Sequence, residues 1–219
     1  MSDQEDPTGS VFRQRLKQQT KAAGLSLANA QLDNLTNYYL LLRRWNRTIN
    51  LTALPLANPS DQSINRLVIE PLQACAFIDD ASLNWFDLAS GGGSPAIPLK
   101  IAKPSLRLTM VESRSRKAAF LREAAHFIGL TGTTVLTSRV EDLIDSGNAA
   151  GSADLVTIRA LKLESVILRV VSALLRPEGR LLLFCSAAQM EPHTTGFAAV
   201  AQAPLFGSNS TLQVFRKTG

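Results

Sequence analysis

The sequence predicts an α/β fold, in which a mostly parallel sheet carries helices on both faces and a helical region precedes it. Beyond residue 82, short apolar runs alternate with helical segments, which is typical of strand, helix, strand repeats. A glycine-rich stretch directly follows the first of these runs, as if the strand delivered the chain to a ligand. Residues 10–80, in contrast, show helical periodicity. We therefore expect a disordered leader over 1–9, a helical region over 10–80 and the sheet over 82–219.

The helical region contains two clear periodic segments and a third after a connector. Residues 11–23 repeat apolar side chains at helical spacing, and Gly24 supplies a stop. A second helix, with Ser26 as its cap, contains Leu32, Leu35, Tyr39 and Leu42. Residues 50–63 are rich in Pro, Asn and Ser and predict a connector. An apolar helical segment then covers 64–78.

The sheet region contains seven apolar runs. Five predicted strands cover 84–89, 106–111, 133–137, 153–158 and 180–185, with helices over 94–102, 115–129 and 162–175. Two late runs, 197–203 and 211–216, are joined by "FGSNS". Because this turn is short, the pair predicts an antiparallel hairpin at one edge of the sheet.

Composition indicates a globular protein in a reducing compartment. The chain has 219 residues, a formal net charge of +5 and a pI near 9.6, which favours a polyanionic partner mildly. Its two cysteines, Cys75 and Cys185, both lie in apolar runs and predict buried thiols. No apolar run approaches the roughly 18 residues of a membrane span, and the first residues do not resemble a signal peptide. We expect a cytoplasmic protein, with no membrane and no metal among its partners.

The stretch "FDLASGGGSP", residues 86–95, follows the first predicted strand. In a doubly wound sheet the ligand lies beyond the carboxyl ends of the strands, where glycines allow a sharp turn and a close approach. A plain linker is the alternative. Glu112 ends the second strand, 21 residues after Gly91, where a carboxylate can accept hydrogen bonds from ribose hydroxyls. This pair favours a cofactor that contains a purine ribonucleoside.

The glycines alone leave two cofactors open. Gly91, Gly93 and Ala96 fit the dinucleotide pattern G-x-G-x-x-[GA]. Asp87, Gly91 and Gly93 also fit the D-x-G-x-G-x-G loop of S-adenosylmethionine sites, with Ala89 in place of the first glycine.

Other residues favour methyl transfer. A dehydrogenase needs a proton relay near its nicotinamide, yet both tyrosines lie in the N-terminal helices and neither His follows a core strand. "SRVEDL", residues 138–143, follows the third strand, where Val140 and Glu141 could hold an adenine.

Several stretches together resemble the ribosomal RNA small-subunit methyltransferase G family, also called glucose-inhibited division protein B. They are "LLLRRWNRTINLTAL", "FDLASGGGSPAIPLKIA", "VESRSRKAAFLRE", "SRVEDL" and "IRAL". The resemblance implies a class I methyltransferase fold with a Rossmann-like core over 82–219, S-adenosylmethionine as cofactor, and methylation of guanine N7 in small-subunit (16S) rRNA. The partner would be the naked rRNA or the 30S particle.

The resemblance also assigns site residues. The cofactor loop would be Ala89, Ser90, Gly91, Gly93 and Ser94; Glu112 would be the acid at the strand end, Val140 and Glu141 the adenine site, and Arg159 the arginine beside the methionine end. Arg159 also makes physical sense, since a guanidinium at a strand end can pair with a carboxylate or a phosphate. Candidate contacts to the RNA substrate are Arg66, Glu70, Arg116, Lys117 and Arg139.

Basic residues form clusters that predict phosphate contacts. Seven lie between residues 100 and 122, namely Lys100, Lys103, Arg107, Arg114, Arg116, Lys117 and Arg122; a second cluster is Arg43, Arg44 and Arg47, and Arg139 is a third point. Guanine N7 carries a lone pair and no proton, so the reaction needs alignment of the two reactants and no general base.

The sequence departs from the family pattern at several positions. The Arg-His-x-x-Asp-Ser motif reads Arg66, Leu67, Val68, Ile69, Glu70 and Pro71; Ala89, Ser94 and Ala96 replace glycine, a bulky apolar residue and glycine; and "FCSAAQ" stands where Lys-Gly is common. We expect a negative φ at Ala89. At Ser94 we expect a loss of packing without a change of backbone geometry. The alternatives to the enzyme are a weak or silent RNA-binding or ribosome-assembly module of the same fold and, less favoured, a nicotinamide dehydrogenase.

Overall fold

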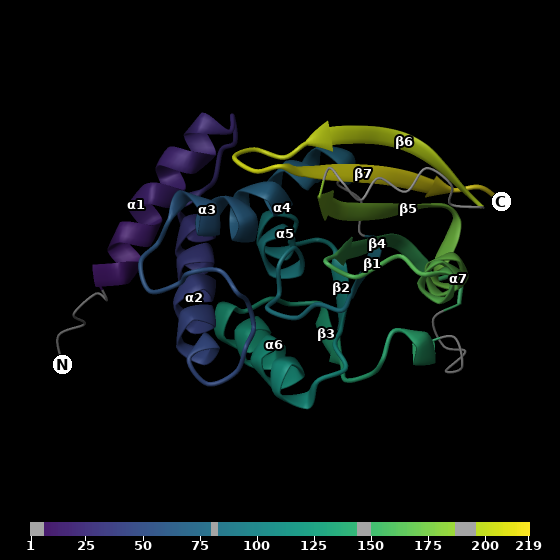
Figure 1. Ribbon diagram of the computed structural model, residues 1–219, viewed down its shortest axis with the longest axis horizontal. Helices are drawn as coiled ribbons and strands as arrows, with labels where there is room; N and C mark the ends of the chain where they lie inside the picture. Colours follow the sequence, from purple (N-terminus) through teal and green to yellow (C-terminus); the bar gives the residue numbers. More distant parts are fainter. Residues whose placement is uncertain (1–6, 80–82, 144–149, 187–195) are drawn as a thin grey trace.

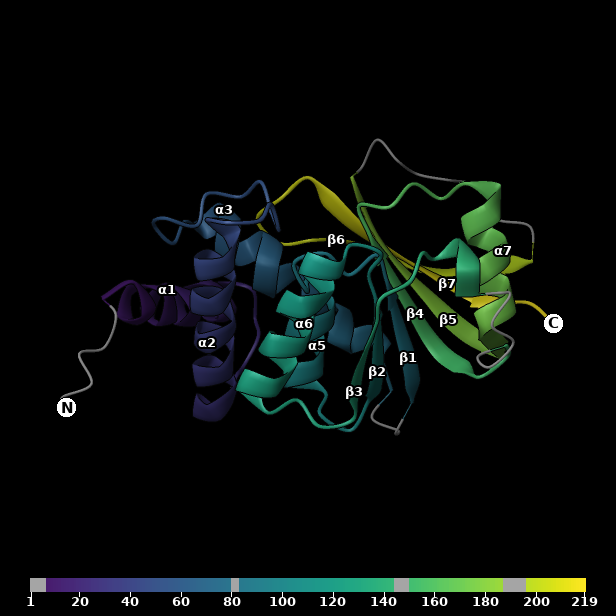
Figure 2. The same cartoon turned by 90° about the horizontal axis from the view of Figure 1, so that it is seen from below.

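A seven-stranded sheet with helices on both faces forms the centre of the molecule (Figures 1 and 2). The computed structural model describes residues 7–79, 83–143, 150–186 and 196–219. The strands are β1 (Asn84–Leu88), β2 (Arg107–Val111), β3 (Thr133–Leu136), β4 (Ala153–Arg159), β5 (Leu175–Ser186), β6 (Phe197–Pro204) and β7 (Ser210–Lys217), in the order β3-β2-β1-β4-β5-β7-β6. This confirms the predicted α/β fold.

The strand directions also follow the prediction. Strands β1 to β5 are parallel, whereas β7 is antiparallel to both β5 and β6. The late hairpin therefore lies at one edge, with β7 inside and β6 outermost. Strand β5 begins five residues earlier than its apolar run: residues 176–178 are exposed, and the register with β4 shifts between the pairs Ala153–Leu175 and Leu155–Arg180.

Helices cover the two faces of the sheet unequally. On one face lie α5 (Ala96–Ala102) and α6 (Ser115–Ile128), with α1 (Pro7–Ala22) and α2 (Asn29–Asn46) outside them (Figure 2). On the other face lie α7 (Ser165–Leu174) and the short 3₁₀ helix η3 (Glu141–Leu143). None of the helices in the described ranges has the length and apolar character that a membrane span needs.

Helix α1 begins earlier than the sequence predicts. Its first residue is Pro7, whose fixed φ and missing N–H suit the first turn of a helix. Residues 7–9 are thus helical, and the predicted leader is too long by these residues; the rest of it, 1–6, lies outside the described residues. Gly9 is buried, and a Cβ there would lie 3.0 Å from Leu40 Cδ1, so this glycine allows α1 to approach α2 closely. The cap of α2 is Ala28, whose N–H donates to Gln31 Oε1 (2.9 Å), and the predicted cap at Ser26 is wrong.

The third helical segment changes its winding along its length. It consists of α3 (Asp61–Ile64), the π-helical η1 (Asn65–Ile69), α4 (Glu70–Gln73) and the 3₁₀ helix η2 (Ala74–Phe77). Pro71 has no N–H, so in this stretch it cannot donate to the carbonyl of Arg66 or Leu67. Both carbonyls accept hydrogen bonds from side chains: Arg159 Nη1 donates to Arg66 O (2.7 Å) and Ser94 Oγ donates to Leu67 O (2.9 Å). The irregular helix is therefore fixed by one side chain from the end of β4 and one from the loop between β1 and α5.

A continuous hydrophobic core joins the helical region to the sheet. One cluster of buried side chains extends from Phe12 and Leu16 of α1 to Leu182 and Phe184 of β5, across the boundary predicted at 80–82. A second cluster lies between the sheet and α7. Tyr38 of α2 donates its hydroxyl hydrogen to the carbonyl of Gly92 (2.6 Å), which connects the helical region directly to the glycine stretch.

Candidate functional site

The loop between β1 and α5 turns sharply through three residues with positive φ. Gly91 and Gly93 have φ of 54° and 85°, and a Cβ on Gly93 would lie 2.5 Å from Ile97 Cδ1. Ala89 has φ of 58°, so the expected negative φ is wrong. The hydrogen bond from the N–H of Ser90, the next residue, to Val111 O at the end of β2 (3.0 Å) fixes the start of the turn at Ala89. A residue with a Cβ at this positive φ destabilises the folded state by about 1–2 kcal/mol.

Glu112 holds the glycine loop in place. Its side chain is almost fully buried, and its two oxygens accept hydrogen bonds from the N–H of Gly91 (2.9 Å) and the N–H of Arg114 (2.8 Å). A carboxylate has about four lone-pair sites, so two remain for hydroxyl groups of a ligand. Glu112 thus connects the loop after β1 to the start of α6 and can still act as an acceptor.

A cavity of about 190 Å³ opens beside this carboxylate. Its lining contains five of the residues predicted for cofactor or substrate, namely Ala89, Glu112, Arg139, Val140 and Glu141. It also contains Val111, Ser113, Ser138, Leu161 and Ile167, which we did not predict. Leu161 is the last residue of "IRAL", and its position just after β4 could have indicated that it lies at the site. The volume is below the roughly 300–1,000 Å³ of small-molecule pockets, so the cavity suits one part of a larger ligand.

Asp87 lies buried beneath the loop. Its Oδ1 accepts a hydrogen bond from Thr157 Oγ1, which in turn accepts one from Trp85 Nε1 (2.9 Å). Its Oδ2 is buried and has no hydrogen-bond partner among the described residues. Desolvation by burial raises the pKa of Asp87 to about 6, against the effects of Thr157, Ser90 and Arg159, which lower it. An unpaired buried acceptor at the end of β1 could accept a hydrogen bond from a cationic ligand group.

Arg159, at the end of β4, binds protein groups on several sides. Nη2 is ion-paired with Glu70, while Nη1 donates to Ser94 Oγ (2.9 Å) and to the carbonyl of Arg66. Its guanidinium carbon lies 4.8 Å from the centre of the Phe184 ring. Burial lowers the pKa of Arg159 to about 10, although Glu70 acts to raise it. Ser94 therefore does more than leave a gap, because its hydroxyl joins Arg159 to Leu67.

Glu70 is fully buried, so the structure places it away from solvent. Its Oε2 also accepts from Arg66 Nη1 (3.0 Å), and the same nitrogen donates to Ser210 Oγ at the start of β7 (2.6 Å). In this conformation Glu70 cannot contact RNA, contrary to our expectation. Arg66, one third exposed, keeps part of its side chain at the surface.

The basic residues between 100 and 122 do not form one surface. Lys100 is buried, and its Nζ donates to the carbonyls of Pro104 (2.7 Å) and Leu106. Arg107 begins β2, at the end of the sheet opposite the glycine loop. The predicted single cluster is therefore wrong in part. Three of the seven lie together at the start of α6, beside Glu112: Arg114 and Arg116 are exposed and Lys117 is half-buried.

Comparison with known proteins decides the family. A family model described as GidB, rRNA small subunit methyltransferase G, matches residues 31–202. The chain belongs to this family. A ribosomal RNA small subunit methyltransferase G from Stenotrophomonas maltophilia is 40% identical over 178 residues, 81% of this chain and 79% of that protein. One from Halalkalibacterium halodurans is 32% identical over 190 residues, 86% of this chain and 77% of that protein.

Solved structures outside the methyltransferase G family share its fold. A SAM-dependent methyltransferase from Aquifex aeolicus aligns with a TM-score of 0.56 at 10% identity, covering 73% of this chain and 94% of that one. A mutant of MtNAS in complex with S-adenosylmethionine aligns with a TM-score of 0.55 at 13% identity, covering 96% and 78%. These likenesses confirm the class I methyltransferase fold.

Proposed function

We propose that this protein transfers the methyl group of S-adenosylmethionine to N7 of a guanine in small-subunit (16S) rRNA. The observation that carries the proposal is the cavity that joins Glu112, Val140 and Glu141 beside the positive-φ loop. These residues come from three separate segments, and the family predicts each of them for one cofactor. The relatives bear the name of an rRNA methyltransferase.

The residues at this edge of the sheet fit the cofactor. The cavity has the size for a base, with Val140 as an apolar wall and Glu112 in reach of ribose hydroxyls. Asp87 Oδ2 lacks a partner in the described structure and suits the ammonium of the methionine end. Bound there, the cofactor would supply an electrophilic methyl group on a sulfonium sulfur.

The roles of the protein residues are binding and positioning. Guanine N7 has an in-plane lone pair and no proton, so no side chain has to remove one. The glycine loop is held by Glu112 and by Tyr38, and this fixed loop would position the cofactor for the reaction. Arg159 is a positioning residue in this proposal, because Glu70 and Ser94 hold its guanidinium against the loop.

Three more of the predicted substrate contacts are basic residues, and one of them lines the cavity. Arg139 is exposed and lines it, and Arg116 and Lys117 lie at the start of α6. Their charge supports contact with rRNA phosphates near the target base. The cytoplasmic location that the sequence predicts belongs to this proposal as well.

One assay tests the proposal. The protein is incubated with S-adenosylmethionine carrying a labelled methyl group and with small subunits, or their naked rRNA, that lack the mark. We expect label on one guanine, at N7, with at least one of these substrates. RNA binding without transfer of label would instead support the silent RNA-binding or assembly module.

A further inference from the structure

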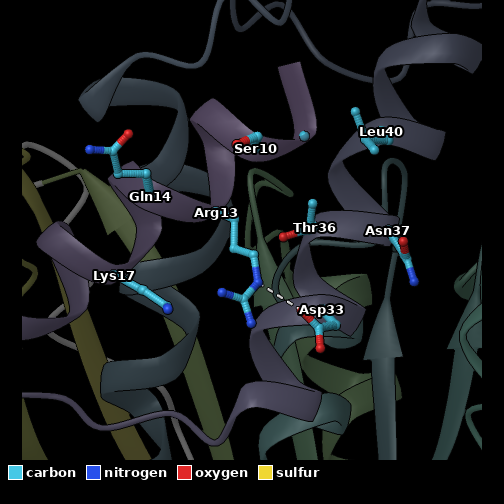
Figure 3. Close-up of a pocket in the computed structure, with 9 residues that line it drawn as sticks. Ser10, Arg13, Gln14, Lys17, Asp33, Thr36, Asn37 and Leu40 are labelled. Carbon is cyan, nitrogen blue, oxygen red and sulfur yellow. Dashed lines mark hydrogen bonds and ion pairs between the residues drawn. The ribbon is translucent and has the colours of Figure 1, made fainter. Parts of the chain in front are cut away.

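A cavity of about 710 Å³ lies between α1 and α2, away from the cofactor cavity (Figure 3). Polar side chains form most of its lining, which consists of Gly9, Ser10, Arg13, Gln14, Lys17, Asp33, Thr36, Asn37 and Leu40. In Figure 3 the side chains of Arg13 and Lys17 extend from α1 on the side that faces α2. No residue predicted for the cofactor or for the methylated base lies here.

A second cavity, of about 360 Å³, continues the first along α2. Asn37 and Leu40 line both, and the second adds Leu41, Arg43, Arg44, Arg47 and Phe127. We call the residues lining the two cavities the α2 groove. Its charged residues are five cations, Arg13, Lys17, Arg43, Arg44 and Arg47, and one acid, Asp33. Glu123 of α6 pairs with Arg44 beside the groove, so the cations outnumber the acids by three when this carboxylate is counted.

Ion pairs hold two of the cations in fixed positions. Arg13 Nε lies 2.8 Å from Asp33 Oδ1, and Arg44 is paired with Glu123 of α6. Within the ranges that the structure describes, Lys17 and Arg47 make no ion pair. The guanidinium groups of Arg13 and Arg44 are thus held in place, and the charges of Lys17 and Arg47 can pair with an anion. Phosphate groups form strong hydrogen bonds with such cations.

Other features of the α2 groove match RNA in particular. Gln14 and Asn37 carry amides and Ser10 a hydroxyl, which can bond to phosphate oxygens and to 2′-hydroxyls. Phe127 is 59% exposed, and an exposed aromatic ring offers a face on which a base can stack.

The groove also leads toward the cofactor loop. Arg47 is the C-cap of α2, and four residues later the carbonyl of Leu51 lies 3.1 Å from the position of a Cβ on Gly92. The Arg47 end of the groove is thus joined by a short segment to the glycine loop, so one RNA strand could contact both. We propose that the α2 groove binds the sugar–phosphate backbone of small-subunit rRNA outside the methylated nucleotide, an inference that rests on the proposed function.

The test compares three single charge reversals, Lys17→Glu, Arg47→Glu and the control Arg107→Glu. Arg107 is exposed and lies at the opposite end of the sheet, so all three variants change the net charge equally. Affinity for 16S rRNA is measured at several salt concentrations, together with S-adenosylmethionine affinity, Tm and methyl transfer at saturating rRNA. We expect the groove variants to bind rRNA about fivefold more weakly or worse, with a salt slope lower by about one. Cofactor affinity, Tm and saturated transfer should stay at wild-type values.

Several results would overturn the inference. Unchanged rRNA affinity in the groove variants, or an equal loss of affinity in Arg107→Glu, would show that the groove does not bind RNA. The proposed function would still stand in that case if the wild-type protein transfers methyl groups. A loss seen with the assembled particle and not with naked rRNA would assign the groove to a ribosomal protein. Wild-type protein that binds no rRNA would overturn both proposals, whereas groove-dependent binding without transfer would overturn only the enzyme.

Discussion

The guanidinium of Arg159 at the end of β4 is ion-paired with the carboxylate of Glu70 at the start of α4, and both side chains lie inside the protein. The pair connects the sheet to the irregular helix, in which Pro71 has no N–H to donate. Ser94 of the glycine loop bonds to the same guanidinium. The position of the loop therefore depends on a helix that does not itself line the cofactor cavity.

Glu70→Gln should destabilise the fold by about 3 kcal/mol, because it leaves the buried charge of Arg159 without its counter-ion. Urea unfolding of wild type and variant measures the difference. The control Glu178→Gln breaks an exposed pair with Arg216 (2.7 Å) and should cost less than about 1 kcal/mol. Equal effects of the two substitutions would show that the buried pair is no more important than a surface pair.

Ala89→Gly should stabilise the protein by about 0.5–1 kcal/mol. Glycine adopts the φ of 58° without the cost of about 1–2 kcal/mol that a Cβ imposes, while the greater freedom of the unfolded chain takes back about 0.4–1 kcal/mol. Thermal unfolding followed by circular dichroism measures this. Ala119→Gly, at an exposed position inside α6, should destabilise by about 1 kcal/mol, so opposite signs are expected. A destabilised Ala89→Gly would contradict the strained turn.

Asp87→Asn should gain stability relative to wild type as the pH rises from about 4 to above 6. The folded-state pKa of about 6 exceeds the unfolded value of 3.8, so the folded wild type binds the extra proton in this window and loses stability as the proton leaves. The stability difference should grow by up to about 3 kcal/mol, at about 1.4 kcal/mol for each tenfold change in proton affinity. Urea unfolding at pH 4, 5, 6 and 7 measures it, with the exposed Asp142→Asn as baseline. A constant difference would show that burial does not perturb Asp87.

Glu112→Ala should weaken S-adenosylmethionine binding by about tenfold or more. The substitution removes the acceptor proposed for the ribose and frees the N–H of Gly91, and each hydrogen bond to a charged group contributes about 1.5–3 kcal/mol. Calorimetric titration with S-adenosylmethionine gives the dissociation constant. Glu141→Ala, which changes an exposed residue of the same lining, should have a smaller effect. Equal losses would contradict the central place of Glu112.

Much of the fold was predictable, because each parallel strand is a short apolar run bounded by polar turns. The start of β5 was not, since Arg176, Pro177 and Glu178 are exposed and do not extend the apolar run, and the pairing with β4 at Leu175 resumes only at Arg180. The π-helical turn was missed for a related reason. Pro71 indicates an interrupted helix, but the sequence does not show which distant donors, here Ser94 and Arg159, replace the lost N–H.

The candidate site was predictable where motif and strand end coincide. Ala89, Glu112 and Val140 each follow a strand, so a parallel sheet brings them to the same edge. The partners of Arg159 were not predictable, since Glu70 is 89 residues away and its burial depends on packing. The α2 groove was missed because it forms only when α1 packs on α2 at Gly9, which brings Lys17 to the same surface as the basic end of α2.

The place of β7 between β5 and β6 has a consequence for the order in which the sheet can assemble. Both of its neighbours precede it in the sequence, so during synthesis the long, apolar edge of β5 has no partner until residues 210–217 have left the ribosome. An unpaired apolar edge is a site of aggregation. Nascent chains that stop before β7 should therefore need protection by a chaperone, although the cofactor loop and the first five strands are already complete.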